Sequence, residues 1–250
     1  MTHSDESIRQ PDSSLANGVE EEKKEPEKVE EGPHYSEEEM AQLQIVRDYY
    51  ECKDPHKWTV QFDDPDFKQS RVIPEGSIVE MMKFFIRIPA SAEACIDTIL
   101  DFDRRMKWDK DIIDARTFDV EEGHRTFRLY HGNKCPATVS DRDFYLYNCL
   151  RRNWPEQGTH TMYGCSIPPD EKAPLHKKRV RAFQHIISCV WKEAVDPKTG
   201  KECCEMFQIQ QLDLNGSIPK WITNNFSKNV PKQFFKKYTN ESIRYDKEVI

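Results

Sequence analysis

The second half of the chain is constrained most by a run of segments in which apolar and polar residues alternate. A period of two is typical of β-strands, and turn signals such as Glu122-Gly123 and the loop at 196–200 separate the segments. Short turns of this kind join antiparallel strands, so the pattern predicts a largely antiparallel sheet. The predicted strands are 112–120, 125–132, 142–152, 159–167, 179–191 and 201–214.

Helical patterns lie on both sides of these strands. The first begins with a capping box, Ser36 with Glu39, and continues with apolar residues at helical spacing. The order of elements predicts an α+β domain in which a long terminal helix covers a curved sheet. The other predicted elements are a helix over 36–50, one or two helices over 91–109 with Ser91 as the cap, a helix from Ser217 onward, and strands over 58–64 and 76–88.

The acidic character of the chain is concentrated at its beginning. Residues 1–40 hold 13 Asp/Glu and 4 Lys/Arg, a net charge of -9, whereas the whole chain carries -7. Such a segment has too few apolar residues to offset its ordering entropy. We therefore expect a disordered tail over 1–35, serving as a regulatory or solubilising arm or as a plain linker, and an ordered domain over 36–250.

The composition limits the class of protein. With 37% hydrophobic and 11% aromatic residues, the chain can build a core, and it has no apolar run of about 18 residues and no signal-peptide pattern. Its eight cysteines contain no Cys-x-x-Cys pair, which favours reduced, mostly buried thiols over disulfides or a metal site. We expect a cytoplasmic monomer, peripheral at membranes, without a metal, a cofactor or a nucleic-acid partner.

The sequence lacks the motifs of common enzymes. Phosphate-binding loops, nucleophile elbows, zinc-protease motifs and dinucleotide fingerprints are all missing. Asp101 and Asp103 stand beside Arg104 and Arg105, which favours surface charge over an acid/base pair. We therefore expect no catalytic activity.

Two amide side chains interrupt apolar strand faces. Asn148 and Gln184 each occupy an alternate position in a row that is otherwise apolar. Either each amide satisfies backbone groups in a solid core, or the two orient a ligand in an apolar cavity. The apolar members of the two rows are Phe144, Leu146 and Leu150 in one strand and Val180, Ala182 and Ile186 in the other.

The terminal helix is both apolar and basic. Apolar residues recur at every fourth position. Because a helix has 3.6 residues per turn, a stripe with this spacing gradually rotates around the helix. A kink at Pro231 could bring the stripe back to the side of the sheet. The pattern fits a helix that binds an anionic membrane surface and equally a core helix with a solvated face. The apolar residues are Ile218, Ile222, Phe226, Val230, Phe234 and Tyr238, with Trp221 and Phe235 beside them, and the basic ones are Lys220, Lys228, Lys232, Lys236 and Lys237.

Four motifs, in this order along the chain, resemble those of a known family. They are Trp108-Asp109, SDRDFYLY at 140–147, RVRA at 179–182 and DLNGSIPKW at 213–221. Over roughly residues 40–240 the chain thereby resembles the START domain, the steroidogenic-acute-regulatory-protein-related lipid transfer module. The run PKQFFKKY after PKWITNNF is most similar to the phosphatidylcholine-transfer subgroup.

The resemblance implies a helix-grip fold, in which a curved antiparallel sheet and the C-terminal helix enclose a tunnel for one lipid. It places a hinge at Asn215 and Gly216, between the last strand and the lid formed by the helix. Where sterol and phosphatidylcholine binders of the family carry an arginine facing the ligand, this chain has Asn148. The residues expected to contact the lipid are Phe144, Leu146, Asn148, Ala182, Gln184, Trp221, Ile222 and Phe226.

We therefore expect a protein that binds and transfers, or senses, a single lipid without catalysis. A glycerophospholipid is favoured, and a sterol or sphingolipid stays open. The alternatives are a helix-grip enzyme acting on a hydrophobic small molecule and a protein-interaction module with a filled core. The expected contacts with a transient membrane surface are Lys228, Lys232, Lys236 and Lys237.

Overall fold

The computed structural model describes residues 35–136, 138–218 and 220–249, and at 124, 220–229 and 249 it describes the backbone alone. The predicted tail lies outside these ranges except for Tyr35, whose hydroxyl donates to the Leu150 carbonyl at 3.0 Å. Within the described ranges, every helix is too short or too polar to cross a membrane.

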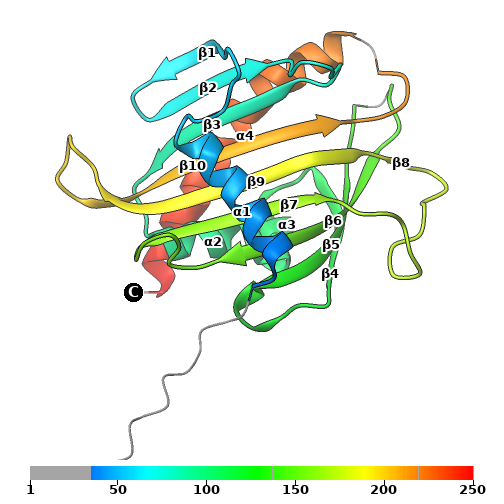
Figure 1. Cartoon of the computed structure of the whole chain (residues 1–250). Coiled ribbons are helices and arrows are strands. Elements are labelled where there is room, and N and C mark those ends of the chain that lie inside the picture. Colours follow the sequence, from blue (N-terminus) through cyan, green and yellow to red (C-terminus); the bar gives the residue numbers. More distant parts are fainter. Residues whose placement is uncertain (1–34, 137, 219, 250) are drawn as a thin grey trace, which may run out of the picture. The chain divides into compact units, whose positions relative to one another are not determined.

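The described residues form one sheet of ten strands, in the order β1-β2-β3-β10-β9-β7-β6-β5-β4 (Figure 1). Every pairing along this path is antiparallel, as predicted, and β8 adds to β6 in parallel. The strands are β1 (Thr59–Asp64), β2 (Phe67–Val72), β3 (Met81–Ile88), β4 (Ile112–Phe118), β5 (Thr126–Asn133), β6 (Arg142–Arg151), β7 (Thr159–Ser166), β8 (Val180–Arg181), β9 (Phe183–Val195) and β10 (Glu202–Asp213).

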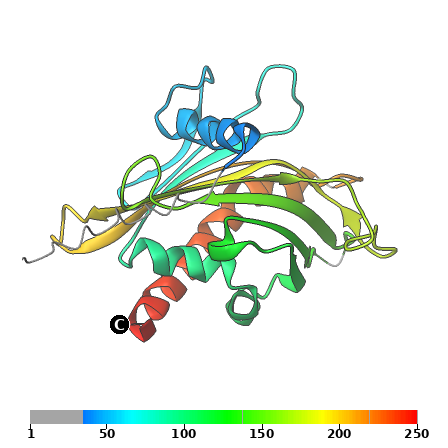
Figure 2. The ribbon, with the colours of Figure 1, turned by 60° about the horizontal axis from the view of Figure 1, so that its bottom comes forward.

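Helices cover both faces of the curved sheet. α1 lies across one face, here called the outer face, and α2, α3 and α4 lie on the opposite, inner face (Figure 2). The predicted α+β helix-grip architecture, an antiparallel sheet around a long C-terminal helix, is confirmed. The helices are α1 (Glu37–Tyr50), α2 (Ala92–Leu100), α3 (Phe102–Trp108) and α4 (Lys220–Val249), with a 3₁₀ turn at Glu122–His124.

Capping residues set where the first three helices begin. The Ser36 hydroxyl accepts from Glu39 N while the Glu39 carboxylate accepts from Ser36 N, which confirms the capping box. Ser91 caps α2 in the predicted way. Asp101 ends α2 and caps α3, its carboxylate accepting from Arg104 N, so residues 91–109 form two helices.

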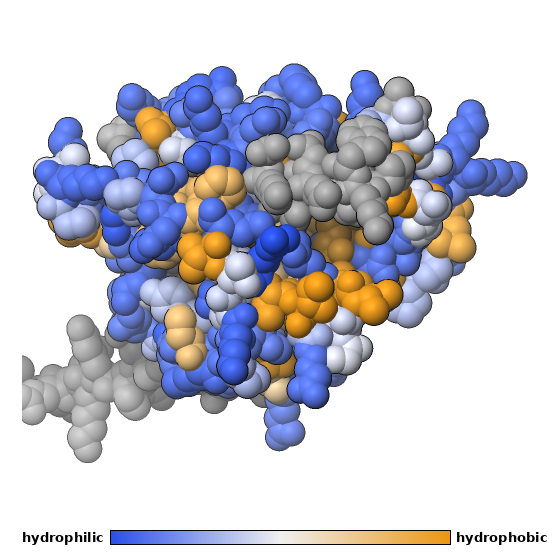
Figure 3. Space-filling view, turned by 90° about the horizontal axis from the view of Figure 1, so that it is seen from above, coloured by the Kyte–Doolittle hydropathy of each residue, from blue (hydrophilic) through white to orange (hydrophobic). Residues whose placement is uncertain are grey.

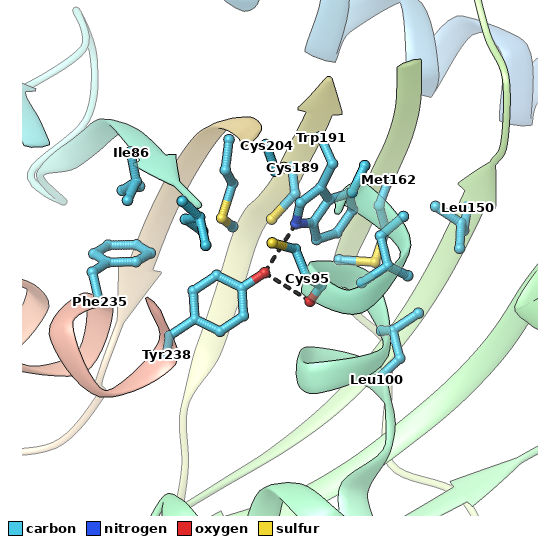
Figure 4. Close-up of a cluster of buried hydrophobic side chains, with 14 of the residues drawn as sticks. Ile86, Cys95, Leu100, Leu150, Met162, Cys189, Trp191, Cys204, Phe235 and Tyr238 are labelled. Carbon is cyan, nitrogen blue, oxygen red and sulfur yellow. Dashed lines mark hydrogen bonds between the residues drawn. The ribbon is translucent and has the colours of Figure 1, made fainter. Parts of the chain in front are cut away.

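The main apolar core lies between the inner face and the three helices on that side. At its centre, Trp191 Nε1 donates to the Tyr238 hydroxyl at 3.1 Å, and that hydroxyl donates to the Cys95 carbonyl at 2.7 Å (Figure 4). These bonds connect β9, α4 and α2, and they satisfy two polar groups that are completely buried. All eight cysteines lie within the described ranges and are free, five of them buried.

Two features of the sheet differ from the sequence prediction. β2 was not predicted, because the four residues between Phe67 and Val72 are polar and only Gln69 is buried. Its strand conformation comes from backbone pairing with β1 and β3. The segment predicted as one strand over 179–191 is divided into β8 and β9, and a register shift follows Gln184, so Gln184 and Ile186 do not share a face.

Candidate functional site

The row of alternate residues on β6 faces the inner side of the sheet. Phe144, Leu146 and Leu150 belong to the inner core, and Asn148 lies between them with 3% of its surface exposed. Asn148 pairs across the sheet with Gly164, where a Cβ atom would approach the Asn148 Oδ1 atom to 2.5 Å. The glycine therefore makes room for the amide.

The Asn148 amide is buried without a partner for its nitrogen. Its Nδ2 atom makes no hydrogen bond within the described part of the chain. An unsatisfied buried donor costs roughly 1–3 kcal/mol, so a native protein rarely keeps one without a use. A ligand oxygen on the inner face would satisfy it.

Replacing Asn148 by leucine tests this assignment. We expect a change in unfolding free energy of less than about 1 kcal/mol, since the substitution orphans no hydrogen-bond partner of the amide nitrogen among the described residues, together with an altered lipid preference. Thermal melts and competition between lipids measure the two effects. A destabilised protein with unchanged lipid preference would instead mean that the amide serves packing.

Gln184 has partners within the protein. Its Nε2 atom donates to the Ile186 carbonyl at 2.6 Å and to the Gln211 carbonyl at 3.1 Å. These bonds hold the strand where its register shifts, and the neighbouring Ala182 is completely buried in the inner core. Ligand contact by Gln184 and Ala182 stays a prediction. In the structure, the Gln184 side-chain nitrogen bonds to backbone carbonyls.

A partly buried cation on α3 completes the polar groups of the inner face. The Arg105 guanidinium lies 5.2 Å from the Phe102 ring centre and 5.7 Å from that of Phe234 on α4. Its Nε atom donates to Asp109 Oδ2 and its NH1 atom donates to the Ile99 carbonyl, both at 3.4 Å. Both bonds are long, so neither holds the group tightly.

Arg105 keeps hydrogen-bonding capacity to spare. Burial lowers the pKa of the guanidinium, and the charge of Asp109 opposes that shift. Arginine still stays charged in proteins and offers five N–H donors, of which two are used within the described residues. The site therefore holds a desolvated positive charge with donors available for an anion.

His131 on β5 lies beside this cation. Its ring stacks on Phe144 with a centroid distance of 4.6 Å, and its Nδ1 atom is 2.6 Å from Asn133 Oδ1. Burial, with a further contribution from the positive Arg105, lowers the pKa of His131 to about 4. The imidazole is neutral at physiological pH. Because an amide oxygen only accepts, Nδ1 carries the proton and Nε2 is left as an acceptor.

The pKa of His131 predicts a pH dependence of stability. An unfolded histidine binds a proton below about pH 6.5, whereas folded His131 does so only near its pKa of about 4. Stability should therefore fall by up to about 3 kcal/mol as the pH drops through this interval. Burial also lowers the pKa of His160, so His160 contributes to the same pH dependence. The wild type is therefore compared with a His131→Phe variant, whose unfolding free energy should depend less steeply on pH.

Chemical denaturation at several pH values measures these slopes. His185 is exposed, and a His185→Phe variant is the matched control that should keep the wild-type slope. Equal slopes in wild type and the His131→Phe variant would contradict the assignment of a depressed pKa to His131.

Several inner-face side chains are enclosed but not fully packed. Arg105 is desolvated, yet 18% of its side-chain surface stays accessible. Four apolar residues packed against the inner core, Met106, Ile187, Leu212 and Phe234, are likewise only partly buried. These partly buried apolar side chains and the polar groups of Arg105, Asn148 and His131 lie on the same side of the sheet as α3 and α4. Apolar surroundings with a few polar groups are typical of ligand sites.

The segment between β10 and α4 is fixed by one buried arginine. Arg142 is 2% exposed, and it donates through Nε to the Leu214 carbonyl at 3.0 Å and through NH2 to the Asn215 carbonyl at 2.8 Å. Its NH1 atom donates to the Ser140 carbonyl. Asn215 and Gly216 both have positive φ angles, 52° and 70°. The predicted hinge thus has an unusual backbone conformation and is attached to the start of β6.

The remaining predicted residues lie on α4. Trp221, Ile222, Phe226 and Lys228 fall outside the residues whose side chains are described. Lys236 and Lys237 are exposed, and Lys232 contacts Asp64 at 3.4 Å and the Phe62 ring at 4.8 Å. Pro231 lies inside the helix, and the kink predicted there stays a prediction.

The sequence analysis missed Arg105 and His131. Its interpretation as surface charge concerned Asp101 and Asp103, which are exposed, and it considered Arg105 only as their neighbour. A signal was present, because Phe102, Arg105 and Asp109 follow one another at three and four residues and so share one face of a helix. His131 carried no such signal, since it stands in a strand between polar and apolar neighbours.

The sheet curved around its C-terminal helix defines a helix-grip protein. The START domain model matches residues 48–248, and the chain belongs to the START domain family. It is 27% identical to mouse START domain-containing protein 10 over 208 residues, which cover 73% of this chain and 68% of that protein.

Solved structures share the fold. Human STARD10 superposes with a TM-score of 0.69 at 20% identity, covering 85% of this chain and 82% of that one. Human StAR-related lipid transfer protein 5 gives a TM-score of 0.67 at 15% identity, covering 85% of this chain and 96% of that one.

Proposed function

We propose that this protein binds one glycerophospholipid between the inner face of the sheet and α4 and carries it between membranes. Membership of the START domain family and the described inner face support this function. The observation that supports the choice of lipid is the Arg105 guanidinium, a partly buried cation with unused donors at an otherwise apolar site. A phosphate group matches it in charge and in hydrogen bonding.

The polar groups suggest how the lipid is oriented. The phosphate lies at Arg105 on α3, and the Asn148 nitrogen donates to an ester or glycerol oxygen. Phe144, Leu146, Ala182 and the predicted roof of Trp221, Ile222 and Phe226 contact the acyl chains. The predicted lysines of α4 contact the membrane during exchange.

Shielding the acyl chains explains why a carrier needs an enclosed site. At about 0.8 kcal/mol per methylene, exposing roughly thirty methylenes to water would cost on the order of 25 kcal/mol. A closed apolar hollow removes most of this penalty. Moving the lipid in and out then requires the lid to open, which is the role we assign to the segment at Asn215 and Gly216.

The proposal predicts one bound phospholipid per chain. Native mass spectrometry of protein purified from cells should show a single mass increment of phospholipid size, and a fluorescent phospholipid should saturate binding near one equivalent. Vesicle-to-vesicle transfer of the same probe measures carriage. A sterol or sphingolipid in the purified protein would replace the proposed ligand, and failure to bind or transfer any of the three classes would refute the carrier function.

A further inference from the structure

The connection between β7 and β8, together with β8 itself, concentrates positive charge. Residues 170–181 contain five Lys/Arg and two Asp/Glu, a net charge of +3, in a chain whose net charge is -7. The connection borders a surface hollow of about 430 Å³. We call it the basic hollow, and it is lined by Arg116, Tyr130, Pro174, Leu175, His176, Lys177 and Lys178.

The arginines next to the basic hollow are neutralised by acids, but the bases that line it are not. Arg179 pairs with Asp114 at 2.6 Å, and Arg181 pairs with the buried Asp143 at 2.9 Å. Within the described ranges, the exposed Arg116, Lys177 and Lys178 have no acidic partner within 4.0 Å. The hollow therefore presents three unpaired cations around a concave surface, which suits a phosphate group.

Exposed apolar side chains stand at the same end of the sheet. Leu175, at the rim of the basic hollow, is 64% exposed, and Ile78, between β2 and β3, is 96% exposed. The register brings both connections to this end, because Met81 at the start of β3 pairs with Gln211 and Val180 of β8 pairs with Arg142. At the right-hand edge of Figure 3, where β8 lies in Figure 1, projecting hydrophilic side chains stand beside apolar ones.

The basic hollow is connected to the segment that precedes α4. The Asn215 side-chain nitrogen donates to the Arg181 carbonyl at 2.9 Å, and Arg142, paired with β8, holds the Leu214 and Asn215 carbonyls. A surface bound at β8 would thus lie next to the hinge of the proposed lid.

We propose that the basic hollow docks the protein on an anionic lipid bilayer. Headgroup phosphates contact Arg116, Lys177 and Lys178, Leu175 enters the interfacial layer, and the start of α4 is thereby brought to the membrane. This inference rests on the proposed carrier function, to which it adds the charge of the membrane surface and the face of the protein that binds it.

The observations favour a bilayer over a phosphorylated peptide. A phosphopeptide would need donors that fix one phosphate and a groove for flanking residues, whereas the cations here are exposed side chains with an apolar residue at the rim. Basic residues flanking exposed apolar ones are the pattern of interfacial membrane contact.

Flotation of the full chain with vesicles, at low salt, tests the proposal. Wild type should bind phosphatidylcholine vesicles that contain about 30% phosphatidylserine, and the affinity should fall as salt rises. Since each basic residue strengthens such binding about fivefold, Lys177→Glu with Lys178→Glu should weaken it about 25-fold or more. Leu175→Ser should weaken it by several-fold even at high salt.

The matched control reverses the charge of two exposed lysines at the opposite end of the molecule, with Lys201→Glu and Lys247→Glu. Its net charge therefore changes by the same amount as that of the Lys177→Glu, Lys178→Glu variant. Equal loss of binding in both double variants, or no binding by wild type, overturns the docking site. Binding of a phosphopeptide but not of vesicles overturns it as well.

Lipid loading, measured by native mass spectrometry, separates this result from the proposed function. If the protein carries lipid normally but binds vesicles equally well with and without the lysines of the basic hollow, only the docking site is refuted. Vesicle binding through the basic hollow in a chain that carries no lipid refutes the carrier function alone.

Discussion

Replacing Arg105 by methionine and Asp109 by asparagine together should weaken phospholipid binding by about 10- to 100-fold. Hydrogen bonds to charged groups contribute roughly 1.5–3 kcal/mol, and the double variant removes those between the guanidinium and the phosphate. The second substitution is needed because methionine alone would leave the Asp109 carboxylate, 5% exposed, buried without its partner. Titration with a phospholipid and with diacylglycerol, which lacks the phosphate, separates headgroup binding from acyl-chain binding.

Arg104 provides the matched control for this prediction. It is the next residue of α3, but it pairs with Glu248 at 2.6 Å and stacks on Tyr245 at 4.2 Å, away from the inner core. Arg104→Met should leave the affinity for both lipids unchanged. The proposed phosphate site is wrong if the Arg105 double variant binds phospholipid as wild type does, or loses diacylglycerol to the same degree.

The fold could be predicted from the sequence because its determinants are local. Alternation over 112–214, the capping box at Ser36 and the cap at Ser91 each act within a few residues, and the structure contains the corresponding elements. β2 was missed because its strand conformation depends on pairing with β1 and β3, while its four central residues are polar. Local patterns cannot report such pairing.

The candidate site could be predicted only in part, for a similar reason. Asn148 was identified because a polar residue in an apolar row is visible in one strand. Arg105 and His131 acquire their properties from residues distant in sequence, such as Phe234 on α4 and Phe144 on β6. The register shift after Gln184, which gave its amide two carbonyl partners, depends on how β9 pairs with β10.

Replacing Arg142 by methionine should destabilise the protein and release the hinge of the proposed lid. The substitution leaves the carbonyls of Ser140, Leu214 and Asn215 without their charged donor. We expect a loss of about 3 kcal/mol, which lowers the melting temperature by about 6–12 °C in a domain of this size. The bound lipid should leave about tenfold faster or more, because the segment before α4 opens more often.

The control must lose stability without losing a hydrogen bond to the hinge, and Arg181→Met meets this condition because the Arg181 carbonyl that accepts from Asn215 is backbone and is retained. It removes the ion pair with the buried Asp143 at 2.9 Å, a change that costs roughly 3–5 kcal/mol, but the side-chain bonds from Arg142 to the hinge carbonyls remain. Lipid release is measured for each variant at the same number of degrees below its own melting temperature. If lid opening is controlled by Arg142, release should then be faster in the Arg142 variant than in the Arg181 variant. Hydrogen exchange over 213–218 should rise only in the former. Equal release rates would mean that global stability, rather than this arginine, sets how fast lipid is exchanged.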